Sequence, residues 1–215
     1  MRHPRPATDL PRATTPRPGG APAGGLRELK KARTREAIQR HALELFREQG
    51  YTQTTVEAIA EAAEVSPSTF YRYFPTKEDV VLYDALDPLV IEAYRRQPVE
   101  LDPLDALRAA FQEVWQALSL VEIEGQVERG RLALTEPVLQ GRYLVELVRT
   151  VSLTADLIAE RLGRDASELE IRVTAGAATG AMLAALLPAL TEDPVPDLGA
   201  SVDAVIDFLR RGFRL

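Results

Sequence analysis

The sequence contains no cysteine and only two histidines, His3 and His41. The lack of cysteine excludes disulfides and thiolate metal sites, and it suits a reducing, cytoplasmic location. Two histidines so far apart give no basis for a histidine-based catalytic or metal cluster. The chain also has no glycine-rich phosphate loop and no motif that pairs carboxylates for acid–base chemistry. We therefore expect no enzyme, with no catalytic residues, no metal site and no cofactor.

Long apolar runs are scarce as well. The one membrane-like stretch, residues 173–191, carries no charge but is rich in alanine, glycine and threonine and contains Pro188. We expect it to be a buried or subunit-interface helix rather than a membrane span. Residues 1–25 hold six prolines, four glycines and four arginines without an apolar run, so they do not resemble a signal peptide. They are expected to form a disordered arm.

Charge is unevenly distributed along the 215 residues. The formal net charge is −6, yet residues 1–49 carry 11 basic and 5 acidic side chains, whereas residues 81–215 carry 13 basic and 22 acidic ones. An acidic protein with a basic front end favours an anionic partner for that end. A basic tail without a partner is the alternative that charge alone leaves open.

The apolar pattern is helical from Leu26 almost to the end, and no sustained alternation indicates a sheet. The sequence predicts an all-α fold of about nine helices. Their expected ranges are 27–49, 55–62, 67–73, 76–97, 103–120, 123–134, 137–162, 167–188 and 198–212. We divide the chain into an arm (1–25), a small helical domain (26–75) and a larger helical domain (76–215).

Helix starts in the small domain carry recognisable caps. Thr54 is expected to cap the second helix, with Glu57 three residues later completing a capping box. Ser66 is expected to cap the third helix. Thr76 is expected to cap the fourth, with Asp79 closing a second capping box.

The third helix lies between two prolines, in the stretch VSPSTFYRYFPTKED. Pro67 suits the first helical position, and Pro75 disfavours helix at Phe74. Two short helices joined by a tight turn and braced by a longer one describe a helix-turn-helix, which reads the major groove of double-stranded DNA. Phe70 and Phe74 share one face of the third helix and are expected to pack inward.

The opposite face carries small or basic groups that suit close approach to base edges. They are Ser66, Pro67, Ser68, Thr69 and Arg72. Tyr71 and Tyr73 flank this face and can reach phosphates with their hydroxyls. Thr54, Thr55 and Lys77 stand at helix starts, where backbone N–H groups also favour a phosphate.

The segment TTVEAIAEAAEVSPSTFYRYFPTKEDVV resembles the DNA-binding signature of TetR-type transcriptional repressors, and TREAIQRHALELFREQGY resembles the first helix of that domain. The resemblance covers about residues 27–82. It implies a dimeric repressor whose C-terminal domain binds a small molecule. By position it implies base-facing sites at Ser66, Pro67, Ser68 and Thr69, and phosphate sites at Thr54 or Thr55, Tyr71, Tyr73 and Lys77. The family usually has glycine at the Glu64 and Ser68 positions, so Glu64 suggests a turn without a left-handed residue.

The last two helices are the best candidates for a homodimer interface. VTAGAATGAMLAALL offers Ala175, Gly176, Ala177, Gly180, Ala181 and Ala184 for close helix approach. VDAVIDFLRRGF offers a stripe of Val202, Val205, Ile206, Leu209 and Phe213. Paired across a two-fold axis, these helices would form a four-helix bundle, whereas ordinary packing inside one subunit is the alternative.

A small-molecule effector is expected among the middle helices. The candidate lining residues are Tyr94, Phe111, Trp115, Leu118, Tyr143, Leu147 and Met182. Arg129, Arg131 and Arg142 flank LALTEPVLQG and could meet an anionic ligand or only neighbouring acids. The order ERGRLALTEPVLQGRY resembles the C-terminal domain of a TetR subgroup related to mycofactocin regulators, which implies an acyl-CoA-like or other amphipathic effector.

Two other classes compete with a ligand-responsive regulator. A helical protein–protein adaptor would show no salt-sensitive DNA binding. A DNA-binding regulator without a ligand would act only through its own concentration.

Overall fold

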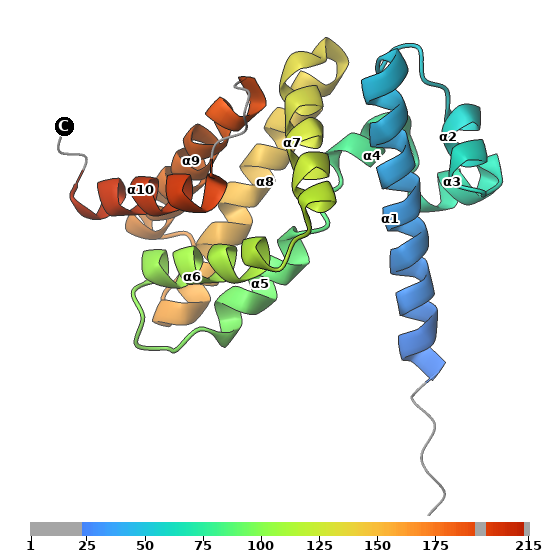
Figure 1. The fold of residues 1–215 in the computed structure, drawn as a ribbon. Helices are drawn as coiled ribbons and strands as arrows, with labels where there is room; N and C mark the ends of the chain where they lie inside the picture. Colours follow the sequence, from blue (N-terminus) through green and yellow to red (C-terminus); the bar gives the residue numbers. More distant parts are fainter. Residues whose placement is uncertain (1–22, 192–196, 213–215) are drawn as a thin grey trace, which may run out of the picture. The chain divides into compact units, whose positions relative to one another are not determined.

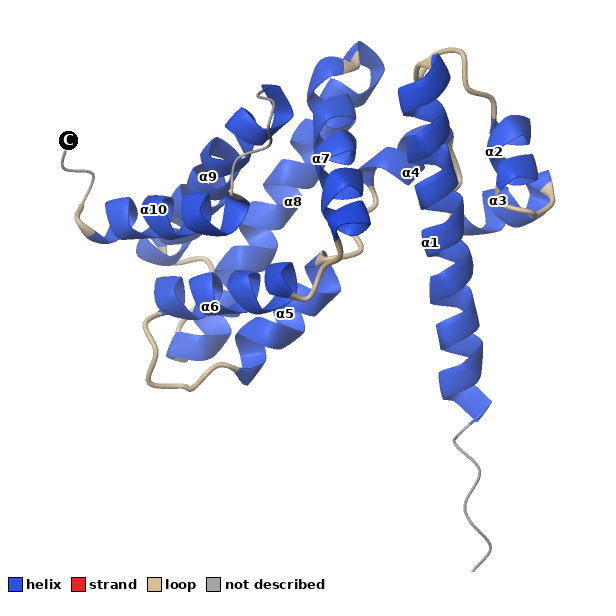
Figure 2. Cartoon of the chain, in the orientation of Figure 1, coloured by secondary structure: helices blue, strands red, loops and turns tan. Residues whose placement is uncertain are grey.

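The computed structural model describes residues 23–191 and 197–212, and the chain divides into two compact units, Met1–Thr34 and Arg35–Leu215. Within the described ranges the regular elements are all helices, without a β-strand (Figures 1 and 2). The helices are α1 (Ala23–Gln49), α2 (Val56–Ala62), α3 (Pro67–Tyr73), α4 (Lys77–Leu82), α5 (Asp87–Arg96), α6 (Pro103–Gln116), α7 (Leu120–Thr135), α8 (Pro137–Leu162), α9 (Leu169–Thr191) and α10 (Leu198–Arg210). The all-α fold class is confirmed.

The described part of the first unit is the beginning of α1. This helix starts at Ala23, a few residues earlier than predicted. Its basic side chains Arg27, Lys30, Lys31 and Arg33 are exposed. The remainder of the expected arm, residues 1–22, lies outside the described residues.

The predicted fourth helix is divided in two. Instead of running from residue 76 to 97, α4 ends at Leu82, and α5 begins at Asp87 after four non-helical residues. Pro88 accounts for the interruption, because proline has no N–H to donate and is tolerated only in the first turn of a helix. The described residues therefore form ten helices rather than about nine, and Asp84 is left in the α4–α5 linker.

Two of the three predicted caps have the expected residues. The Ser66 hydroxyl accepts a hydrogen bond from the Thr69 N–H (3.1 Å). Thr76 and Asp79 form a reciprocal capping box at α4. The cap of α2 is one residue later than predicted: the Thr55 hydroxyl, not that of Thr54, accepts from the Ala58 N–H (3.1 Å).

One core joins the small domain to two helices of the larger one. Its largest fully buried members include Ile38 of α1, Ile59 of α2, and Phe70 and Phe74 at α3. Leu132 of α7 and Leu139 of α8 belong to the same cluster. The α2–α3 pair therefore packs into a core that α7 and α8 of the larger domain complete.

The apolar helix α9 packs against α8 and α10. By length and composition, Leu169–Pro188 would suffice to cross a membrane, although the core helix of a soluble protein passes the same test. Ala175 and Ala178 are fully buried, while Val173, Gly180 and Ala184 are exposed. The helix therefore buries one face inside the chain and leaves a narrow apolar face uncovered.

Candidate DNA interface and ligand cavity

The third helix is oriented by its two phenylalanines. Phe70 is 0% and Phe74 is 2% exposed, which confirms that both point inward. Phe74 packs edge-on against Tyr83 (ring centroids 5.8 Å apart). This anchoring fixes which face of α3 is turned outward.

The outward face is small and rich in hydroxyl groups. Ser66, Pro67 and Ser68 are exposed, and Thr69 is half-buried. The Ser66 hydroxyl lies 2.9 Å from that of Ser68 and donates to the Thr69 hydroxyl (3.0 Å). A short helix with such small side chains can approach a groove closely and offer hydroxyls to base edges.

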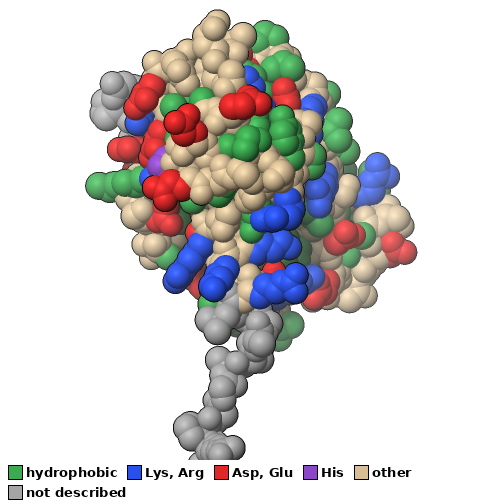
Figure 3. All heavy atoms as spheres, turned by 90° about the vertical axis from the view of Figure 1, so that its right-hand side faces the viewer, with side chains coloured by type: hydrophobic (Ala, Val, Ile, Leu, Met, Phe, Trp, Pro, Cys, Tyr) green, Lys and Arg blue, Asp and Glu red, His purple; other side chains and the backbone are tan. Residues whose placement is uncertain are grey.

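Two tyrosines and an arginine flank this face. Tyr71 is 49% exposed, and Arg72 is also exposed. Tyr73 is half-buried, and its ring centroid lies 5.4 Å from the Arg72 guanidinium carbon and 5.9 Å from that of Arg35. Tyr71 and Arg72 therefore suit phosphate contacts, whereas Tyr73 also contributes to packing. In Figure 3, Lys and Arg side chains gather on the part of the surface where α1 begins.

Thr54 is placed in the interior instead of on the DNA-facing surface. It is 1% exposed, and its hydroxyl donates to the carbonyls of Gly50 (2.9 Å) and Leu45 (3.3 Å). These two bonds tie the residues before α2 to the end of α1. The expected phosphate contact therefore falls to the exposed Thr55 alone.

Lys77 also stabilises the small domain through hydrogen bonds to the α1–α2 loop. Its ammonium donates to the carbonyls of Tyr51 (2.8 Å) and Thr54 (3.0 Å) and lies 4.2 Å from the Tyr51 ring centroid. Burial lowers the pKa of this ammonium below its usual value. Lys77 thus ties the start of α4 to the α1–α2 loop, and a phosphate contact would use its remaining N–H.

The turn between α2 and α3 corrects one expectation. Glu64 has φ 54°, the left-handed conformation that glycine adopts at lower cost. The same turn is held by the Val65 N–H, which donates to the Ala60 carbonyl (2.9 Å). The turn therefore does require a left-handed residue, and Glu64 occupies it despite its side chain.

A cavity of about 300 Å³ lies among the helices of the larger domain. Its walls come from the end of α4, the α4–α5 linker and helices α5 to α10. Five predicted residues line it: Phe111, Trp115, Tyr143, Leu147 and Met182. Phe111 and Trp115 stack with an interplanar angle of 11° and centroids 5.4 Å apart, which gives the cavity a flat aromatic wall.

The other two predicted lining residues, Tyr94 and Leu118, are not among the residues that surround this cavity. Tyr94 is 2% exposed, and it packs in a separate core with Ala93, Ala106 and Ala110. Burial raises the pKa of its hydroxyl to about 12. Tyr94 is therefore a core residue. The prediction failed because the spacing of an aromatic residue along a helix is the same whether it faces the core or a cavity.

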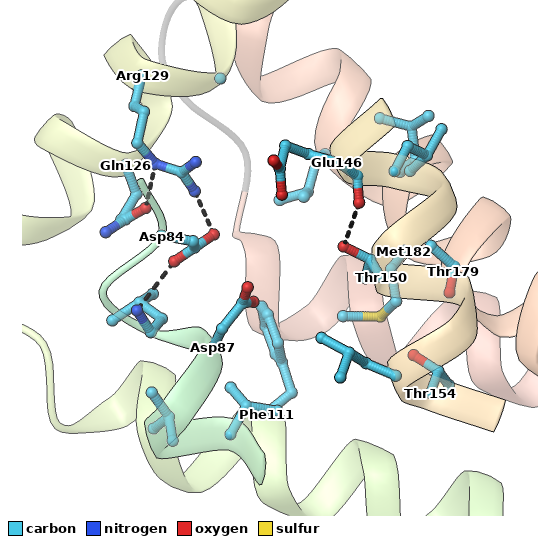
Figure 4. Close-up of a pocket in the computed structure, with 18 of the residues that line it drawn as sticks. Asp84, Asp87, Phe111, Gln126, Arg129, Glu146, Thr150, Thr154, Thr179 and Met182 are labelled. Atoms are coloured by element: carbon cyan, nitrogen blue, oxygen red, sulfur yellow. Dashed lines mark hydrogen bonds and ion pairs between the residues drawn. The ribbon is translucent and has the colours of Figure 1, made fainter. Parts of the chain in front are cut away.

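One end of the cavity is polar, and of its residues only Arg129 was named from the sequence as a possible ligand contact. Arg129 of α7 forms an ion pair with Asp84 and donates to the Gln126 side chain (3.0 Å). Figure 4 shows the Asp87 carboxylate pointing into the space between this group and Glu146 of α8. Burial, and secondly the Asp84 charge, raise the pKa of Asp87 to about 6. These residues come from four different segments, so no local motif announces them.

The three arginines near LALTEPVLQG all meet acids. Arg129 pairs with Asp84, Arg131 with Glu128 (3.4 Å), and Arg142 with Asp79. Of the two alternatives left open by the sequence, the structure favours pairing with neighbouring acids over a site for an anion.

Arg142 connects the cavity wall to the DNA-facing domain. It lies on α8 beside the lining residue Tyr143, and its guanidinium donates to the Thr76 hydroxyl (3.0 Å) and to the Asp79 carboxylate. Thr76 and Asp79 form the capping box of α4, three residues after α3 ends. A displacement of α8 would therefore act directly on the segment that follows the third helix.

Comparison with known proteins agrees with this arrangement. Residues 38–83 match the family described as bacterial regulatory proteins, tetR family, and residues 101–214 match the MftR C-terminal domain. The chain is 39% identical to the HTH-type transcriptional regulator TcmR of Streptomyces glaucescens over 168 aligned residues. The alignment covers 77% of this chain and 68% of TcmR.

Solved structures show the same fold. The FadR repressor of Thermus thermophilus in complex with lauroyl-CoA is 26% identical, with a TM-score of 0.52 over 84% of this chain and 95% of that one. The fatty acid degradation regulator FadR of Bacillus halodurans is 24% identical, with a TM-score of 0.59 over 84% and 96% of the two chains. From its helix-turn-helix, its C-terminal domain and these relatives, the chain belongs to the TetR family of transcriptional regulators, and it is not an enzyme.

Proposed function

We propose that the protein is a ligand-responsive repressor that binds a palindromic operator as a homodimer in the cytoplasm and is released by a small amphipathic effector. The observation that carries this proposal is the link through Arg142, which joins a wall of the cavity to the cap of the helix that follows α3. A ligand that prefers one position of α8 would shift the protein between DNA-binding and released states.

The DNA contacts of this proposal come from the outward side of α3. Ser66, Pro67, Ser68 and Thr69 would face base edges, with Arg72 beside them, while Thr55, Tyr71, Tyr73 and Lys77 would contact phosphates. One short helix reads only a few base pairs. A dimer would read two half-sites about 34–36 Å apart, or a multiple of that distance.

The dimer interface of this proposal uses α9 and α10. Apart from the adjacent backbone of α9 itself, a Cβ atom added at Gly176 or Gly180 would meet no atom of the described residues within 4 Å, so packing inside the described chain does not explain these glycines. Close packing of a helix from the partner subunit would explain why glycine stands at these two positions. Val202 and Ile206, both predicted interface residues, are 0% exposed within the chain, so α10 would contribute Val205 and Leu209 instead. Phe213 lies outside the described residues.

The apolar body of the effector would occupy the cavity between the aromatic wall and Met182. An acyl-CoA-like effector is one form of this proposal, supported by the matching C-terminal domain and by the lauroyl-CoA complex of the Thermus thermophilus relative. Its acyl chain suits the apolar lining. The carboxylates at the polar end suit it less, because its phosphate groups are anionic.

The experiment is binding-site selection with the purified full-length protein on genomic DNA. The proposal predicts enrichment of an inverted repeat, with affinity that falls steeply as salt concentration rises. A helical adaptor would enrich no sequence, and that outcome would reject the proposal. Release of the selected DNA by a cell extract would separate a ligand-responsive regulator from one that acts without a ligand.

A further inference from the structure

We infer that the effector is an amphipathic cation, with an apolar, preferably aromatic body against Phe111 and Trp115 and an ammonium group beside Asp87 and Glu146. This inference rests on the proposed function only in taking the cavity as the effector site.

The charge balance at the polar end is negative. Three carboxylates line it, those of Asp84, Asp87 and Glu146, against one guanidinium, that of Arg129. Arg129 is already used by Asp84 and Gln126. Glu146 has Arg149 at 3.7 Å, but Arg149 is 71% exposed and does not line the cavity. An anion placed here would meet carboxylates, whereas a cation would be attracted.

Asp87 has the least compensated of these charges. Asp87 is exposed as a residue and lines the cavity, and within residues 23–191 and 197–212 no hydrogen bond or ion pair of the protein reaches its carboxylate (Figure 4). The surrounding charged groups are Asp84, Glu146, Arg129 and Arg149, with the Tyr143 hydroxyl also nearby in the wall. Burial raises the pKa of Asp87 to about 6. The carboxylate is therefore ionised near neutral pH with water but no protein group as its partner, and an ammonium group would replace that water.

A second polar group also lacks a partner. Thr179 of α9 lines the cavity, is 8% exposed, and its buried hydroxyl makes no hydrogen bond. Buried hydroxyls are normally satisfied, so this one is an unusual unpaired group, although its oxygen is closed to water in the free protein. Thr150 of α8 also lines the cavity, but its hydroxyl donates a hydrogen bond to the Glu146 carbonyl (3.0 Å). A ligand in the cavity would place its ammonium at Asp87 and its apolar body toward the aromatic wall.

A metal ion does not account for the carboxylates. Among the described residues, no group of three His, Asp or Glu side chains is arranged to hold a metal ion. The aromatic wall and the apolar lining also favour an organic cation over a hydrated inorganic one.

The test uses three probes with one apolar body: 2-(1-naphthyl)ethylamine, 2-(1-naphthyl)ethanol and 1-naphthylacetate. Isothermal titration calorimetry measures the binding of each probe, because the naphthyl group absorbs and emits in the same range as Trp115, the only tryptophan of the chain. We expect the amine to bind at least about tenfold more tightly than the alcohol, and the carboxylate to bind least. Asp87→Asn and Glu146→Gln should each remove most of that preference without weakening alcohol binding. Asp156→Asn, an exposed carboxylate of α8 away from this cavity, should change nothing.

Equal binding of amine and alcohol, tighter binding of the carboxylate or of lauroyl-CoA, or an unchanged preference in both Asp87→Asn and Glu146→Gln would overturn the inference. Operator binding is measured separately by fluorescence anisotropy. If the amine binds but the operator is not released, the ligand class stands and the release mechanism fails. If the operator binds normally but the amine preference is absent, the ligand class alone fails.

Discussion

The DNA-facing helices and the cavity-forming helices solve opposite packing problems. Around α3, large side chains such as Ile38, Ile59, Phe70 and Phe74 are almost completely buried, and little space is left. Between α5 and α9, a cavity of about 300 Å³ persists, with a hydroxyl that has no partner and an uncompensated carboxylate in its walls. The first region is filled by its own side chains, whereas the second keeps the space in which we propose that an effector binds.

The largest expected effect is the difference in stability loss when a phenylalanine in each region is replaced by alanine. Phe70→Ala should lower the free energy of unfolding by about 3–5 kcal/mol, because it opens a hole in a filled core. Phe111→Ala should cost about 1–2 kcal/mol, because that ring is half-buried beside space that already exists. Urea denaturation followed by circular dichroism measures both. Equal losses would contradict the difference in packing.

The next effect concerns the contact between the regions. Arg142→Met should remove about 1–2 kcal/mol of local stability from the capping box of α4. Hydrogen exchange of the α4 amides should then accelerate roughly 5–30-fold, with α8 unchanged. Arg95→Met is the control, because it breaks another exposed pair between helices, that of α5 with Glu160 of α8 (2.9 Å), which does not involve α4. Identical exchange in α4 for both variants would show that Arg142 does not connect the regions.

A smaller effect is expected within the DNA-facing region. Glu64→Gly should raise the free energy of unfolding by about 0.5–1 kcal/mol, because glycine relieves the left-handed strain and loses part of that gain to its greater chain entropy. Glu61→Gly, an exposed change within α2, should instead destabilise by about 1 kcal/mol. A loss of stability in both variants would mean that the φ of Glu64 costs nothing.

The smallest effect concerns the cavity and depends on pH. The pKa of Asp87 is raised in the folded protein, so the folded state holds the proton more tightly than the unfolded chain. Ionisation of Asp87 therefore reduces stability as pH rises through about 6, and Asp87→Asn should stabilise the free protein at pH 8. Solvent screening keeps this gain below about 1 kcal/mol. At pH 4 the two proteins should unfold at the same temperature, and a constant difference at both pH values would contradict the assignment.

The sequence predicted the DNA-facing region better than the cavity, for physical reasons. Caps, prolines and inward aromatics act over a few residues, so Ser66, Pro67, Phe70 and Phe74 could be placed from local rules. Pro88 carried the signal for the break before α5, but the apolar pattern around it concealed that signal. Asp84, Asp87 and Glu146 meet only through tertiary packing, which no spacing along the chain reveals. The left-handed conformation of Glu64 was not predicted, because a residue with a Cβ atom rarely adopts the positive φ that this turn requires.

The most direct measurement is binding-site selection on the wild-type protein and Thr69→Ala in parallel. Thr69 lies on the outward side of α3, and its substitution leaves the buried phenylalanines untouched. The account predicts an inverted repeat for both proteins, with base preference altered at one position in each half-site for Thr69→Ala. The same consensus from both proteins, or no consensus from the wild type, would contradict the claim that this face of α3 reads DNA.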